Sequence, residues 1–132
     1  MSSKGSERIN AYPVGEWVAA SKFGQFTGVA ILALADGGDS VTAQLRKATD
    51  ANGSNATNFG AAVTTTLPGT SPAANDTIKA AANGRSDELG KTPGGLEYTH
   101  VSLAISGGSP EIEQGMLIAF DPRYSGDAIG VP

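Results

Sequence analysis

The sequence predicts an all-β protein with an antiparallel β-sandwich or jelly-roll-like fold of about seven to eight short strands. Turn signals recur about every ten to fifteen residues, and the segments between them alternate in polarity or are rich in β-branched residues. Glycine accounts for 18 of the 132 residues, and charged residues for only 17%. That composition favours a chain with many turns and a surface of Ser, Thr and Asn. The sequence shows neither a long helical pattern nor a βαβ alternation.

The length of the chain fits one domain. Residues 1–10, MSSKGSERIN, are small, polar and charged, so we expect a flexible N-terminal arm. Residues 11–132 then form a single β-sandwich domain. Hydrophobic residues make up 39% of the chain, and many of them are alanine. We therefore expect a thin core and some stabilisation by association with other subunits.

Charge and cysteine content exclude several classes of protein. The net charge of −4 argues against nucleic acid as the main partner, because phosphate binding needs a basic face. Without cysteine, neither a disulfide framework nor a cysteine metal site can form. The first apolar run, 29–35, is internal and far shorter than the ~20 residues that span a bilayer. We therefore expect no signal peptide and no membrane partner.

The first half of the chain contains three predicted strands. Residues 16–20 form a short strand with Trp17, the only tryptophan, as a core or subunit-contact anchor. Residues 23–35 are apolar on both sides, which predicts a central strand. The Asp-Gly-Gly-Asp sequence at 36–39 then predicts a tight hairpin turn into the alternating strand 40–48.

The second half of the chain contains further candidate strands at 59–67, 76–82, 96–106 and 114–120. Residues 76–82, DTIKAAA, fit a short strand or one helical turn equally well. Asn83-Gly84 after them is a turn dipeptide. Residues 96–106 alternate well, with Val101 and Leu103 on one face.

His100 is the only histidine and the only candidate for a Ser-His-Asp type of site. The sequence contains no G-x-S-x-G motif, and His100 lies within a predicted strand. A structural or surface role is the better interpretation, and a hydrolase with His100 and a carboxylate is the minor alternative.

The polar segment after strand 40–48 resembles a calcium loop in composition, because Asp50, Asn52 and Asn55 cluster there. The spacing does not fit an EF-hand: the glycine comes at the fourth position, and Ala61 occupies the place of the bidentate glutamate. We therefore predict a loop whose side chains bond to its own backbone, with no metal.

The sequence Asp-Pro-Arg-Tyr at 121–124 contains two residue types that often anchor interfaces. Arg123 and Tyr124 combine large contact areas with hydrogen-bonding ends. The segment fits either a strand terminator whose tyrosine folds back on the sandwich edge or a contact between subunits.

Several segments together resemble a known family. LRKATDANGSNA at 45–56 is similar to a QQATDAAGTGAK-type segment, SDEL…GGLEYTHV at 86–101 to SEELD…GGFRYVRV, and DPRY at 121–124 to LDPRYAP. INAYP at 9–13, followed by Trp17, also fits. These features resemble small structural proteins encoded among the head genes of tailed bacteriophages, a capsid decoration or cement-like family. The chain departs from that pattern at 52–55, NGSN, and in the insertion at 91–93.

The resemblance implies a virion structural protein that binds the capsid exterior and stabilises the head, made in the host bacterial cytoplasm. Its partners would be the major capsid protein and its own copies, as a dimer or trimer. The family has no catalytic residue, cofactor or metal to carry over. The alternatives are a minor head–tail or tail protein and a carbohydrate-binding or host-adhesion module. The candidate interface residues are Arg8, Tyr12, Trp17, Arg123 and Tyr124.

Overall fold

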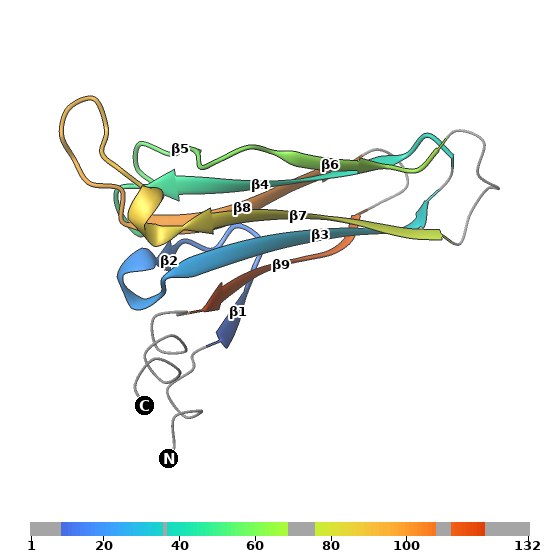
Figure 1. The fold of residues 1–132 in the computed structure, drawn as a ribbon, viewed down its shortest axis with the longest axis horizontal. Helices are drawn as coiled ribbons and strands as arrows, with labels where there is room; N and C mark the ends of the chain where they lie inside the picture. The colour runs from blue at the N-terminus through green and yellow to red at the C-terminus, as the bar shows by residue number, and fades with distance from the viewer. Residues whose placement is uncertain (1–8, 36, 69–75, 108–111, 121–132) are drawn as a thin grey trace, which may run out of the picture.

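A computed structural model describes residues 9–35, 37–68, 76–107 and 112–120 as a sandwich of two antiparallel sheets (Figure 1). This confirms the predicted all-β fold. The first sheet has the spatial order β1 (Ile9–Pro13), β9 (Ile112–Phe120), β3 (Gln25–Ala35), β7 (Asp76–Arg85). The second has the order β2 (Val18–Ala19), β8 (His100–Gly107), β4 (Ser40–Ala48), β5 (Thr57–Asn58), and β6 (Val63–Thr66) also pairs with β4.

The strand order is that of a jelly roll. From β1 to β4 each successive strand lies in the other sheet, and from β6 to β9 the chain again changes sheet at every step. In consequence the first strand pairs with the last, and Ile9 lies opposite Phe120. Eight-strand double sheets of this kind are the jelly-roll architecture. Here β5 and β6 together fill one strand position beside β4.

The predicted hairpin at 36–39 is wrong. β3 pairs with β7 and β9, whereas β4 pairs with β5, β6 and β8, so the turn carries the chain from one sheet to the other. Its end is fixed by two backbone hydrogen bonds to Leu67, the residue after β6: the Gly38 N–H donates to the Leu67 carbonyl at 2.7 Å, and the Leu67 N–H donates to the Asp39 carbonyl at 2.8 Å. Both β3 and β4 carry apolar side chains, and in opposite sheets these faces can bury one another.

Two other expectations meet different outcomes. The central position predicted for 23–35 is confirmed, because β3 lies between β9 and β7. The ambiguous segment 76–82 is strand, but Asn83-Gly84 is not a turn, since both residues lie inside β7 opposite Thr27 and Phe26. Glycine is required at 84 for a close approach: a Cβ there would lie 2.5 Å from Cε2 of Phe59.

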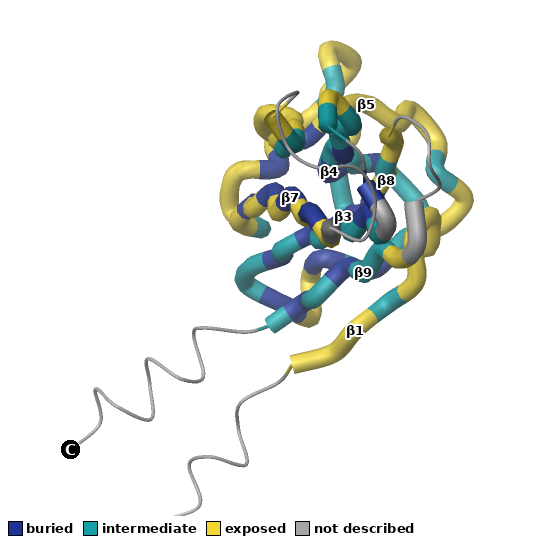
Figure 2. Tube along the Cα trace, turned by 90° about the vertical axis from the view of Figure 1, so that its right-hand side faces the viewer, coloured by how far each residue is buried: buried dark blue, intermediate teal, exposed yellow. Residues whose placement is uncertain are grey.

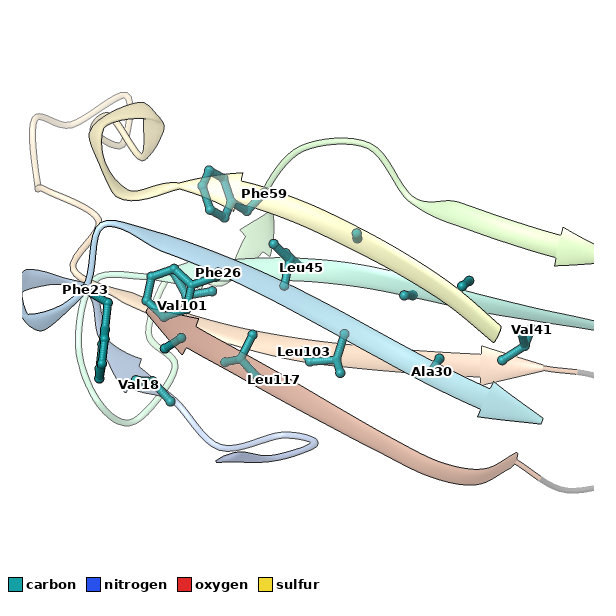
Figure 3. Close-up of a cluster of buried hydrophobic side chains, with 14 of the residues drawn as sticks. Val18, Phe23, Phe26, Ala30, Val41, Leu45, Phe59, Val101, Leu103 and Leu117 are labelled. Atoms are coloured by element: carbon teal, nitrogen blue, oxygen red, sulfur yellow. The ribbon is translucent and has the colours of Figure 1, made fainter. Parts of the chain in front are cut away.

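The core lies between the two sheets. Its largest fully buried side chains are Phe26, Leu32, Leu45, Leu103, Leu117, Val41 and Val101 (Figure 3). Much of the remaining buried surface comes from alanines. A Cβ on Gly28 would lie 2.5 Å from Cδ1 of Leu103, so small residues on β3 allow side chains of the opposite sheet to reach it closely.

Helical structure in the described ranges consists of two 3₁₀ turns, η2 (Ala20–Lys22) and η3 (Ser86–Glu88). They lie side by side: the Ser86 hydroxyl of η3 donates to the Ala20 carbonyl of η2 at 3.4 Å, and the Ser86 N–H donates to the Gly24 carbonyl just beyond η2 at 3.0 Å. No helix in this part of the chain is long and apolar enough to cross a membrane.

Candidate functional site

Two of the segments that carry the family resemblance meet at one end of the sandwich. This loop end consists of the loop 49–55 after β4, the segment 89–99 before β8, and Trp17 (Figure 1, left). The end of β4 lies beside the start of β8, with Ala48 opposite His100. Thr99 joins the two segments: its N–H donates to the Ala48 carbonyl and its hydroxyl to the Thr49 carbonyl, both at 2.9 Å.

The loop 49–55 bonds to itself, as the sequence predicts. Oδ1 of Asp50 accepts the N–H groups of Asn52 at 2.9 Å and Ser54 at 3.1 Å. The backbone N–H of Thr49 donates to the Ser54 carbonyl at 2.9 Å, which closes the loop. Hydrogen bonds from Ser54 are the main reason that the pKa of the Asp50 carboxyl lies below its ordinary value. One carboxylate oxygen of Asp50 thus accepts two backbone N–H groups of its own loop.

Trp17 packs on this loop. A Cβ at Gly53 would lie 2.6 Å from Nε1 of the indole, so only glycine fits beneath the ring. Gly53 also has a φ of 83°, which favours glycine on backbone grounds. Trp17 is half-buried, and the structure places it as the anchor of the loop.

Lys47 is a residue of the loop end that the sequence reasoning missed. Its Nζ donates to the Leu89 carbonyl at 2.6 Å and lies 4.4 Å from the centre of the Tyr98 ring. The Phe59 ring centre is 5.9 Å away. A signal was present in the sequence, since Lys47 continues the inward positions of β4 after Leu45. The ammonium group therefore covers the end of the core and ties β4 to the segment before β8.

The segment 90–97 forms a closed loop that projects from the loop end (Figure 1, orange). The backbones of Lys91 and Glu97 pair as an isolated antiparallel β-bridge. The Thr92 N–H donates to the Leu96 carbonyl at 2.8 Å. The strand predicted from 96 begins only at His100, so Leu96 lies in the loop and is 57% exposed.

The candidate interface residues have different positions. Tyr12, on β1, points inward and meets Phe23 edge-on, with ring centres 6.2 Å apart. Trp17 lies against Gly53 and is half-buried, and the interface role predicted for it stays a prediction. The remaining candidates, Arg8, Arg123 and Tyr124, lie outside the described residues. Ile9 and Asn10, expected in the arm, belong to strand β1.

His100 is half-buried at the start of β8, with Nδ1 2.8 Å from the Thr99 hydroxyl oxygen. That hydroxyl donates its proton to the Thr49 carbonyl, so it accepts from Nδ1–H of the imidazole. The hydroxyl nearest to the histidine is thus engaged and is not placed as a nucleophile. Within the described ranges, no three His, Asp or Glu side chains are grouped so that they could hold a metal ion.

A surface cavity of about 500 Å³ lies between η2 and η3. The guanidinium of Arg85 pairs with Asp87 at 3.1 Å, and the Ser86 hydroxyl donates to the Phe23 carbonyl. Arg85, Ser86 and Asp87 are thus engaged in these contacts, which do not form a pair of nucleophile and base.

The strand order defines the chain as a jelly-roll β-sandwich domain. No family model matches it, and no curated protein matches it in sequence. Among solved structures it is similar to the Eiger TNF from S. frugiperda, with 5% identity and a TM-score of 0.40 over 86% of this chain and 84% of that one. A similarity at this level supports no inference about function.

Proposed function

We propose that this chain is a non-enzymatic virion protein that decorates the exterior of a bacteriophage capsid and stabilises the head. The observation that carries the proposal is the contact between two of the segments on which the family resemblance rests. Thr99 bonds to Ala48 and Thr49, and Lys47 reaches Leu89 and Tyr98. These residues are far apart in the sequence and form one packed unit, as expected if the resemblance reflects a shared fold.

The outer face of the second sheet also supports this role. Thr42 and Thr64 share a hydroxyl hydrogen bond of 2.7 Å, and Arg46 donates to Asn58 Oδ1 at 2.6 Å. Hydroxyl and amide groups of this kind suit a face that stays in water. Many copies on a lattice can each bind weakly, because repeated contacts add through multivalency. The jelly roll serves many functions, so the fold alone does not carry the proposal.

The proposal is tested by deleting the coding sequence from the phage genome and purifying the particles. We expect heads to assemble but to release DNA at a lower temperature, and purified protein added back to restore the wild-type release temperature. Cryo-EM of wild-type particles should show the chain on the head surface. Its absence from purified virions would overturn the proposal, and a position on the tail would favour the alternative of a minor tail protein.

A truncation tests the role of the N-terminal arm. Removing residues 1–8 leaves β1, which begins at Ile9, intact. We expect the truncated protein to keep its unfolding midpoint and to bind heads with lower occupancy. Full occupancy on heads would show that the arm makes no contribution to binding. A glycan array serves as the parallel test of the host-adhesion alternative.

A further inference from the structure

The chain contains the tripeptide Ala-Asn-Gly twice, in two different environments. One copy, 51–53, lies in the loop 49–55, and the other, 82–84, lies inside β7. Asparagine is a chemically labile residue, and a following glycine exposes it most, because glycine has no side chain to keep the next backbone nitrogen away from the asparagine amide. Since the two tripeptides are identical, a difference in their reactivity in the folded protein comes from the tertiary structure.

The reaction of such a pair needs only water as a co-reactant. The backbone nitrogen of the glycine gives its proton to hydroxide or another base and attacks Cγ of the asparagine. A bond forms between that nitrogen and Cγ, the bond from Cγ to Nδ2 breaks, and the amide takes up a proton and leaves as ammonia. Water then adds to one of the two carbonyls of the five-membered imide, and the backbone nitrogen regains its proton as the ring opens. The product is aspartate or isoaspartate, and no electron is transferred.

The side-chain amide of Asn52 is exposed and unrestrained. Within the ranges that the structure describes, no hydrogen bond engages its Oδ1 or Nδ2, and only its backbone N–H is bonded, to Oδ1 of Asp50. The attacking group, the N–H of Gly53, donates to the Asp50 carbonyl at 3.1 Å. This turn bond lies in an exposed loop, where bonds open locally at little cost in free energy. Opening one turn therefore frees the nitrogen for the attack.

Asn83 is held by its own side chain and by its strand. Its Oδ1 accepts a hydrogen bond from the Thr27 hydroxyl at 2.6 Å, which fixes the amide against β3. Figure 2 shows the regular alternation of buried and exposed residues along β7, and Gly84 is one of the buried positions, beneath the ring of Phe59. Bringing the Gly84 nitrogen to Cγ requires a rotation out of the extended backbone, which breaks the pairing of β7 with β3. Opening a paired strand costs far more than opening one surface turn.

We propose that Asn52 is a site of spontaneous deamidation and isoaspartate formation, and that the fold protects Asn83. The products change the loop end in two ways. Either acid adds a negative charge two residues from Asp50, and isoaspartate also inserts the side-chain methylene into the main chain. A Cβ on Gly53 would lie 2.6 Å from Nε1 of Trp17, so a lengthened loop displaces the indole. The inference concerns the chemistry of this loop and does not depend on capsid binding.

Peptide mapping by mass spectrometry tests the proposal on the purified full chain. One sample is kept native and the other unfolded in guanidinium chloride, both for weeks at mildly alkaline pH, where more of the backbone nitrogen is deprotonated. In the native sample we expect Asn52 to convert at least about tenfold faster than Asn83. In the unfolded sample we expect the two rates to agree within about threefold, because no structure distinguishes the tripeptides. Each sample reports both sites, so the unfolded chain is the matched control.

Two variants separate the causes. Asp50→Ala removes the oxygen that accepts the N–H groups of Asn52 and Ser54, so we expect faster conversion of Asn52 and an unchanged rate at Asn83. Fresh Asn52→Asp carries the charge without the inserted methylene, so converted wild type, and not this variant, should show altered Trp17 fluorescence. Equal native rates at the two sites, faster conversion of Asn83, or an Asn52 that stays intact while the unfolded sample converts would overturn the proposal. Unchanged Trp17 fluorescence in a fully converted sample would overturn the inferred effect on the loop end.

Discussion

Gly84→Ala is the change that tests the packing of this sandwich most directly. Gly84 lies inside β7, and its φ is outside the positive range, so alanine is compatible with the backbone. On backbone grounds alone, the substitution should stabilise the protein by about 0.4–1 kcal/mol through the unfolded chain. The new Cβ would however lie 2.5 Å from Cε2 and 2.8 Å from Cζ of Phe59. Since Phe59 is 4% exposed, its ring has little room to move.

Overpacking a core by a methyl group costs about 1–3 kcal/mol. Setting this cost against the backbone gain, we expect Gly84→Ala to lower the free energy of unfolding by about 1–2 kcal/mol. Phe59→Leu removes the atoms at the end of the ring. In that background we expect Gly84→Ala to become neutral or slightly stabilising, with a coupling energy of about 1–3 kcal/mol.

The assay is urea denaturation of wild type, Gly84→Ala, Phe59→Leu and the double variant. Unfolding is followed by the fluorescence of Trp17, the only tryptophan. Gly94→Ala serves as the control, because its Cβ would meet only Thr92 Oγ1 at 3.8 Å. The reasoning is refuted if Gly84→Ala lowers the free energy of unfolding by the same amount in wild type and in the Phe59→Leu background. Glycine at 84 would then have a purpose other than the approach of the ring.

Two further predictions concern the loop end. Lys47→Met keeps the aliphatic stem but leaves the Leu89 carbonyl without its donor. We expect a loss of about 1–3 kcal/mol in urea denaturation, and a loss below about 0.5 kcal/mol would contradict the role given to Lys47. The pKa of Asp50 is lowered in the folded state, so its stabilising contribution is present above the ordinary value of 3.8 and is lost as pH falls through the lower folded value. We expect Asp50→Asn, whose amide oxygen can still accept the backbone donors, to lose less stability than wild type below pH 3.8; equal losses would contradict this.

The candidate site shows where sequence reasoning succeeds. The bonding within the loop 49–55 follows from its own Asp, Ser and Asn residues, which lie within a few positions of one another. The contact of Trp17 with Gly53 could not be predicted, because it depends on how β2 and β4 are placed within their sheet. For the same reason, the sequence showed Lys47 only as a charged residue at an inward position of β4, after the apolar Leu45. Its partner, the Leu89 carbonyl, could not be predicted.

The sequence by itself determined the fold class, the alternating strand Ser40–Ala48, the central apolar strand β3 and the self-bonded loop. Each follows from local chemistry: side-chain period, β-branching, turn residues and short polar side chains. Only the tertiary structure decided that β3 and β4 lie in different sheets and that Ile9 meets Phe120. Only the tertiary structure decided that Ile118 and Phe120 of β9 face outward beside β1 and β3. A period of two separates the faces of a strand, but which face is buried, and against what, depends on partners far away in the chain.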